Sequence, residues 1–303
     1  MAEDLEHLLP ECRADALLSP TERIELVKVD RWVTYARADV VLMHLNSLLR
    51  YPLHDRMPCM LLYGLPGMGK TKILQKFLRD HPSGFDEAKG ISCINVIGIQ
   101  MPPDADEKSL YEEVLCALDA RIHYGHTTPQ MRRTARDLMT FVDARMLIID
   151  ELHTLLGGGY RQQRILLNAI RFLANDLKLT LVCAGTADAK RALATDRQLA
   201  DRFRAVELPA WNDDASFHRF LVSFGAALPL QKKSDLLFAP LRRSILEHTE
   251  GVLVRIVGLL KELAIEAIQS GRERIDRQSL RTLPSLVPLI SMESSLEPSQ
   301  SAS

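Results

Sequence analysis

The sequence lacks the features that place a protein in a membrane or carry it out of the cell. No apolar run among its 303 residues approaches the roughly 20 residues that span a bilayer. The acidic N-terminal stretch, MAEDLEHLLPE, has no signal-peptide pattern. Both absences predict a cytoplasmic protein with no membrane partner.

The sequence also has few cysteines and almost no net charge. The five cysteines include no C-x-x-C pair, and Cys59, Cys93 and Cys183 lie in apolar stretches, so buried free thiols in a reducing compartment are expected. Lys and Arg number 38 against 39 Asp and Glu. Because no overall charge draws the chain toward nucleic acid, any contact with DNA has to come from a local patch.

The sequence does contain short apolar strands that alternate with helical patterns. After a capping box at Ser19, Pro20 and Glu22, strands are expected at 59–64, 91–100, 145–150, 179–185 and 203–208, and helices at 37–50, 70–80, 106–120 and 160–177. In the last of these helices, Ile165, Ala169, Leu173 and Leu177 are expected on one side. The alternation predicts an α/β fold with a parallel sheet between helices.

A phosphate-binding loop joins the first strand to the helix that follows. GLPGMGKT, from Gly64 to Thr71, matches the pattern G-x-x-x-x-G-K-[ST]. Backbone N–H groups and the start of a helix can surround phosphate oxygens there, so a chance glycine turn is the weaker interpretation. Lys70 should reach the β- and γ-phosphates, and Thr71 should bind Mg²⁺. The candidate nucleotide-binding residues are Gly64, Leu65, Pro66, Gly67, Met68, Gly69, Lys70, Thr71 and Lys72.

An acidic pair ends the third strand, in MLIIDELH. Asp150 can hold Mg²⁺, and Glu151 can polarise the attacking water. The alternative is that the two acidic residues only cap the next helix. It is the weaker interpretation, because the pair follows a buried strand in a chain that already has a phosphate loop. His153 is expected to make a local polar contact rather than to act as a base.

Further candidates lie beyond the fourth strand. Thr186 can sense the phosphate, cap the next helix, or do both. One of Arg197, Arg202 and Arg204, ahead of the fifth strand, can reach the γ-phosphate of a neighbouring subunit, although each can instead form a surface ion pair with Asp196 or Asp201.

The pattern becomes purely helical after Pro209, with helices expected at 214–225, 235–249, 251–270 and 276–282. The predicted domains are an N-terminal extension (1–36), an ATPase core (37–209), a helical lid (210–283) and a disordered tail (284–303) rich in Ser and Pro.

Several stretches resemble the TniB/TnsC family of AAA+ regulators of DNA transposition, which includes those of CRISPR-associated transposons. The most specific are QMPP, ELHTLLGGGYRQQRILLNAIRFLANDL and LADRFRAVELPAW, and the resemblance covers roughly residues 20–280. The phosphate loop departs from the family, whose members often have polar residues where this chain has LPGMG.

The resemblance implies an AAA+ P-loop ATPase of the bacterial cytoplasm that binds ATP and Mg²⁺. It also implies a homo-oligomer, as a hexameric or heptameric ring or a helical filament on duplex DNA, that connects a TniQ-type target selector to a DDE transposase. The family pattern carries over onto Lys70, Thr71, Asp150, Glu151 and Thr186. It makes Arg202 the candidate arginine finger, and Arg255 either a second nucleotide sensor or part of an exposed helix face.

Family analogy places the DNA contacts between the second and third strands, where Lys108, Arg121, Arg132 and Arg133 lie. A solvated helical face is the alternative, because acidic residues surround Lys108. Two other functions share the phosphate site: a helicase loader or IstB-like ATPase, and a nucleotide switch that acts without DNA. The chain is too short for the second core that a DExH helicase would need.

Overall fold

The structure is a computed structural model that describes residues 5–87, 90–103, 106–122, 125–157 and 159–282. The predicted tail, 284–303, lies outside these residues. The chain divides into two compact units. Among the described residues, 40–209 form the sheet unit, and 5–39 together with 210–282 form the helical unit.

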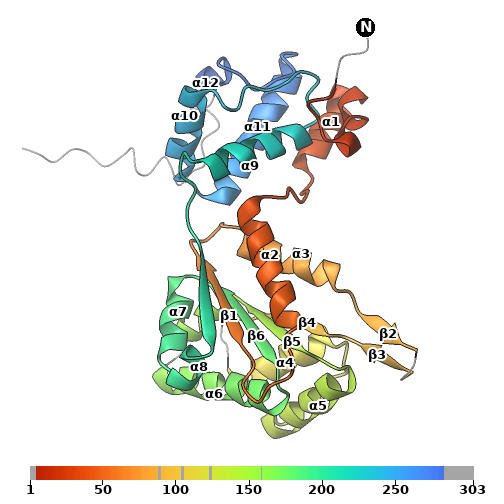
Figure 1. Cartoon of the computed structure of the whole chain (residues 1–303), viewed down its shortest axis with the longest axis vertical. Helices are drawn as coiled ribbons and strands as arrows, with labels where there is room; N and C mark the ends of the chain where they lie inside the picture. Colours follow the sequence, from red (N-terminus) through yellow and green to blue (C-terminus); the bar gives the residue numbers. More distant parts are fainter. Residues whose placement is uncertain (1–4, 88–89, 104–105, 123–124, 158, 283–303) are drawn as a thin grey trace, which may run out of the picture. The chain divides into compact units, whose positions relative to one another are not determined.

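A parallel five-stranded sheet forms the centre of the sheet unit, in the order β4-β5-β6-β1-β7 (Figure 1). The strands are β1 (Cys59–Gly64), β4 (Val96–Gln100), β5 (Met146–Asp150), β6 (Thr180–Gly185) and β7 (Phe203–Leu208). β5 and β6 are buried along their whole length, as predicted for parallel strands covered on both faces. In the edge strand β7, three of the six residues are exposed.

Helices cover both faces of this sheet. One face carries α4 (Glu107–Ala117), α5 (Thr128–Phe141), α6 (Tyr160–Asp176) and α7 (Ala187–Ala194). Their apolar side chains form one core with strand residues such as Leu61, Leu147 and Leu181. The next residues along the strands point to the other face, where Leu78 of α3 (Lys70–Asp80) lies over Gly98. Asn46 of α2 (Ala36–Leu49) contacts His81 at the end of α3.

The prediction of one strand over 91–100 is wrong, because the structure has two strands there. Its first part, β3 (Ile91–Cys93), pairs antiparallel with β2 (Gly84–Asp86) in a hairpin apart from the main sheet, and only β4 joins that sheet. Asn95 separates the two strands: its carbonyl accepts the N–H groups of Arg145 and Met146, and its side chain bonds Asp143. The sheet therefore gains β4 only after the chain has passed Asn95.

One helical prediction in the sheet unit also needs correction, and one helix was missed. Ile165 of α6 is 42% exposed, because the buried side of this helix is centred on Leu166, Ile170 and Leu173. α5 was not predicted. Three short elements complete the unit: β2 of the hairpin, the 3₁₀ helix η3 (Leu152–Gly157) and α8 (Arg197–Ala200).

The helical unit contains α1 (Pro20–Lys28), α9 (Ala215–Ala227), α10 (Ala239–Thr249), α11 (Leu253–Gln269) and α12 (Ser279–Thr282), with the 3₁₀ helices η1 (Pro10–Cys12) and η2 (Asp15–Leu17). Residues 210–282 contain no strand, as predicted, and the capping box of Ser19 and Glu22 is present. Along the described chain, no helix is long and apolar enough to cross a membrane.

A buried ion pair ties the N-terminal segment into the helical unit. Arg23 of α1 donates from Nη2 to Glu273 Oε1 at 2.8 Å and from Nη1 to Pro229 O at 3.3 Å. Arg23 is 2% exposed and Glu273 is 8% exposed. Because removing one partner would leave a buried charge uncompensated, the pair holds α1 against the loop that follows α11.

The cysteines are free thiols. Cys59 and Cys183 are buried as predicted, and burial raises the pKa of both, which keeps them unreactive. The prediction for Cys93 is wrong, because this residue of the hairpin is only half-buried.

Candidate nucleotide-binding site

The phosphate loop lies between β1 and α3, as the sequence predicted. Gly67 and Gly69 have φ values of 76° and 86°, a left-handed conformation that glycine adopts without strain. The first turn of α3 follows directly and directs its N-terminal N–H groups toward the loop. The exposed members of the candidate set are Leu65, Pro66, Gly67 and Lys72, whereas Met68 and Lys70 are buried.

Lys70 folds back over the loop. Its Nζ donates to Gly64 O at 3.0 Å and to Leu65 O at 2.9 Å. Burial lowers the pKa of Lys70, and the negative charges of Glu151 and Asp150 partly oppose that shift. A buried ammonium group that is hydrogen-bonded to carbonyl groups is well suited to attract an anion into the loop.

Thr71 and Asp150 bring two hard oxygen ligands together. Thr71 Oγ1 donates to Asp150 Oδ2 at 2.6 Å, which joins the start of α3 to the end of β5. Mg²⁺ takes one or two protein oxygens and fills its other positions with water and phosphate. The Thr71 hydroxyl and the Asp150 carboxylate fit the Mg²⁺ that accompanies a nucleotide.

Glu151 stands in an unusual backbone conformation. Its φ is 57°, in the left-handed region that residues with a side chain seldom adopt. Its N–H donates to Asp150 Oδ1 at 2.8 Å, so the turn is fixed by the preceding carboxylate. His153 Nδ1 lies 3.2 Å from Glu151 Oε2, the local polar contact that the sequence predicted.

Thr186 follows β6, the strand between β5 and β1. Its Oγ1 accepts the N–H of Asp188 at 3.3 Å and so caps α7, which confirms the capping interpretation. A second role as a phosphate sensor stays a prediction.

Arg202 and Arg255, the two arginines to which the family resemblance gives a role, are both held by groups of their own chain. Arg202 donates from Nε to Met57 O at 3.1 Å and from Nη1 to Asn175 Oδ1 at 2.6 Å, while its Nη2 is buried without a partner among the described residues. Arg255, in the helical unit, pairs with Glu250 and is 19% exposed, so it is not on an open helix face.

The four candidate DNA contacts lie on α4, on α5 and between them. Lys108 pairs with Glu112 at 3.5 Å, Arg132 with Glu107 at 3.7 Å and Arg133 with Asp137 at 3.8 Å. Arg121 is exposed, with no ion pair among the described residues. Exposed pairs of this kind contribute about 0–1 kcal/mol, so the cations can exchange their partners for phosphate.

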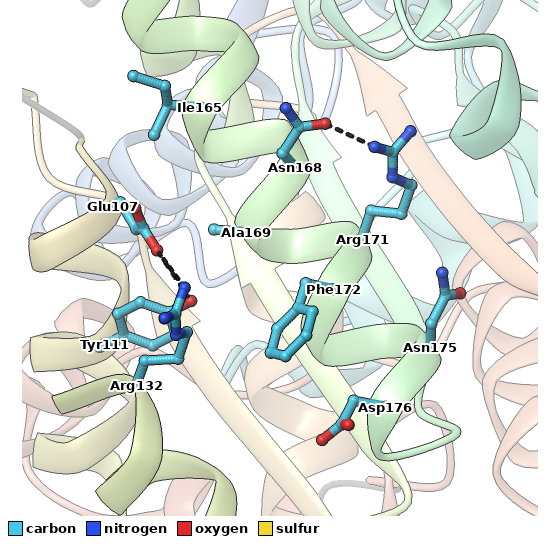
Figure 2. A pocket seen from close by; sticks show the side chains of 10 residues that line it. All are labelled: Glu107, Tyr111, Arg132, Ile165, Asn168, Ala169, Arg171, Phe172, Asn175 and Asp176. Atoms are coloured by element: carbon cyan, nitrogen blue, oxygen red, sulfur yellow. Dashed lines mark hydrogen bonds and ion pairs between the residues drawn. The ribbon is translucent and has the colours of Figure 1, made fainter. Parts of the chain in front are cut away.

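Arg132 also lines a groove of about 650 Å³ between α4, α5 and α6. Figure 2 shows Glu107, Tyr111 and Arg132 on one side of the groove and the α6 residues on the other. The Arg132 guanidinium lies 5.7 Å from the ring centre of Phe172. None of the candidate nucleotide-binding residues lines this groove.

Sequence patterns give no sign of a polar network beside the phosphate loop. Tyr63, the residue before Gly64, donates its hydroxyl to Glu207 Oε2 at 3.0 Å, and Lys190 Nζ lies 4.9 Å from the ring centre of Tyr63. Tyr63 and Glu207 are opposite each other only because β1 and β7 are neighbours. Nothing in the spacing of the three residues reveals that pairing.

Family comparison agrees with this geometry. The family described as Bacterial TniB protein matches residues 23–213, which include every nucleotide-site candidate except Arg255. The chain belongs to the TniB family. No curated protein matches this TniB protein in sequence.

Solved structures similar to the TniB protein share its fold. The Aeropyrum pernix ORC1 protein in complex with DNA matches with a TM-score of 0.63 and 17% identity, over 86% of this chain and 68% of that one. Cdc6p from Pyrobaculum aerophilum gives 0.59 and 19%, over 88% and 71%. Drosophila ORC bound to DNA gives 0.58 and 14%, over 94% and 70%. The predicted AAA+ fold is therefore confirmed.

Proposed function

We propose that this TniB protein is an ATP-dependent regulator of DNA transposition. It assembles on duplex DNA and connects a TniQ-type target selector to a DDE transposase. The observation that carries the proposal is the joint occurrence of a TniB family match with Lys70, Thr71 and Asp150 around one phosphate loop. Two of the similar structures are described as bound to DNA, which supports the DNA component of the proposal.

In the proposed ATPase reaction, the loop and Lys70 bind the phosphates, and Thr71 and Asp150 hold Mg²⁺. The ion would supply positive charge to the phosphate oxygens. Glu151 orients a water molecule, whose oxygen forms a bond to the γ-phosphorus as the bond to the bridging oxygen breaks. Glu151 accepts the proton of the water, ADP leaves, and inorganic phosphate is formed. Thr186, at the end of the neighbouring strand, donates to the γ-phosphate.

Arg202 completes this site in trans in our proposal. It precedes β7, whose six residues span about 20 Å from Arg202 to the carboxyl end of the sheet. Because β7 runs parallel to β1, Arg202 lies at the edge opposite the phosphate loop of its own subunit. Any phosphate that it contacts therefore belongs to a neighbour. Nη2 is buried without a partner in the described part of the single subunit, so the contact requires the guanidinium to leave Met57 O and Asn175 Oδ1 and turn toward the neighbour.

Arg202→Ala is expected to lower ATPase activity by about 10³-fold, the smaller of the arginine-finger effects measured in GTPases. Mixing it with Glu151→Gln, which keeps the arginine, should restore part of the activity. Arg197→Ala and Arg204→Ala are the matched variants, since both side chains are exposed nearby. If mixing with Glu151→Gln restores the ATPase activity of one of these variants instead, that residue is the finger. If mixing restores the activity of none of the three variants, although they assemble, action in trans is refuted.

The DNA surface is tested by replacing Lys108, Arg132 and Arg133 together with alanine. With ATP present, duplex binding should weaken, and the slope of log affinity against log salt should fall by about 2–3, because the variant has three fewer cations to neutralise phosphate. Wild type should assemble on duplex DNA only with ATP, as followed by analytical ultracentrifugation. A nucleotide switch independent of DNA would assemble equally well without the duplex.

The matched control removes three exposed cations from the helical unit, Lys232, Lys233 and Arg243. It changes net charge by the same amount and should leave the salt slope unchanged. If the α4–α5 variant binds ATP and keeps the wild-type affinity and slope for DNA, the DNA surface lies elsewhere.

A further inference from the structure

His153 Nδ1 lies close to the Glu151 carboxylate without forming a hydrogen bond to it. Nδ1 of His153 lies 3.2 Å from Oε2 of Glu151, and the two side chains are 32% and 33% exposed. The distance is that of a hydrogen bond, but the groups are not aligned for one. Nδ1 is buried and has no other hydrogen-bond partner among the described residues. A buried ring nitrogen of this kind costs free energy unless the bond forms in another state of the site.

Packing places the imidazole against the end of β6. η3, which carries His153, packs against α7 and β6. A Cβ at Gly185 would lie 3.3 Å from His153 N and 3.6 Å from Nδ1, so the residue rests on the end of β6 where no side chain intervenes. Thr186 is the next residue. His153 is therefore held between Glu151 and the end of β6, which the proposed phosphate sensor follows.

The backbone of Glu151 is fixed as well, by its left-handed turn and its bond to Asp150 Oδ1. The following residue, Leu152, is fully buried. The direction of the Glu151 carboxylate therefore depends only on rotation about its side-chain bonds. Lys70, whose charge acts on Glu151, donates its hydrogen bonds to loop carbonyls instead. His153 is thus the donor placed to set that rotation.

We infer that His153 is a positioning residue: its Nδ1–H orients the Glu151 carboxylate toward the attacking water. Hydrogen bonds in active sites without substrate are often misaligned and tighten once substrate is bound. A neutral ring with its proton on Nδ1 is sufficient, and His153 neither contacts the substrate nor transfers a proton. The inference rests on the proposed function, because it requires Glu151 to act on water.

The kinetic test compares His153→Leu, which removes the donor, with His153→Asn, whose amide nitrogen takes the place of Nδ1. His153→Leu should lower kcat about tenfold to a hundredfold, with the KM and the binding affinity for ATP within about twofold of wild type. His153→Asn should recover most of kcat. In the Glu151→Gln background, His153→Leu should have no further effect. An unchanged kcat in His153→Leu, or equal losses in both variants together with weaker ATP binding, would overturn the inference.

Nuclear magnetic resonance of ¹⁵N-histidine-labelled protein supplies a readout that does not depend on turnover. The His153 ring, assigned with His153→Asn, should show the Nδ1–H tautomer. Its Nδ1 signal should shift when a non-hydrolysable ATP analogue and Mg²⁺ are added, and that shift should shrink in Glu151→Gln. An Nε2–H tautomer, or a signal that neither the ligand nor Glu151→Gln moves, would contradict the inference. A wild type that binds no nucleotide would instead refute the proposed function, while the effect of Glu151→Gln on the nucleotide-free spectrum still tests the contact.

Discussion

Replacement of Lys70 by alanine is expected to weaken ATP binding by about a hundredfold or more and to abolish ATP-dependent assembly. Lys70 Nζ already donates to Gly64 O and Leu65 O, so its charge is in place before phosphate arrives. Hydrogen bonds to charged groups contribute about 1.5–3 kcal/mol each, and 1.4 kcal/mol is a tenfold change in affinity. Nζ has three N–H donors, so when ATP binds it gives up one carbonyl bond and donates twice to phosphate, and the removal of these two hydrogen bonds accounts for the expected effect.

Fluorescent ATP titration measures this weakening, and Lys76→Ala is the matched control. Lys76 lies on the same helix and pairs with Asp80, so its removal takes away one charge without touching the loop. Thermal unfolding without nucleotide checks that the Lys70 variant keeps its fold. Near wild-type ATP affinity in a folded Lys70→Ala protein would show that the loop does not bind the phosphates through this lysine.

The phosphate loop could be predicted because all of its signals are local. The apolar strand, the glycines, Lys70 and the helix that follows lie within 22 consecutive residues, and the structure keeps them in the expected elements. Asp150 could be predicted for a related reason. Parallel strands end at one edge of a sheet, so a carboxylate after a buried strand reaches the same edge as the loop.

Other features depend on partners that are distant in the sequence. The split between β3 and β4 depends on β2 and on the 142–146 segment. An apolar run has the same sequence pattern whether it forms one strand or two. The left-handed turn at Glu151 has no signature in MLIIDELH. The helix α5, by contrast, has local signals that could have predicted it: Thr127 and Gln130 form a capping box, and Met131, Ala135 and Met139 recur at helical spacing.

Glu151→Gln is expected to bind ATP as wild type does and to hydrolyse it about 10²–10⁴ times more slowly, the usual contribution of a general base. Glutamine keeps the shape of the side chain, and the backbone N–H that bonds Asp150 Oδ1 is unchanged, so the left-handed turn should persist. The amide cannot accept the proton of the attacking water. If hydrolysis dismantles the assembly, complexes on duplex DNA should also last longer.

Single-turnover hydrolysis and the lifetime of DNA complexes after dilution measure both effects, with Glu207→Gln as the matched control. Glu207 is exposed and bonds Tyr63 beside the loop, so its replacement makes the same chemical change close to the site without touching the proposed water position. Asp150→Asn should behave differently from Glu151→Gln, because weakening the Mg²⁺ ligand lowers the affinity for Mg²⁺-ATP as well as turnover. Equal turnover by Glu151→Gln and wild type would remove Glu151 from the reaction, and with it the basis for the role of His153.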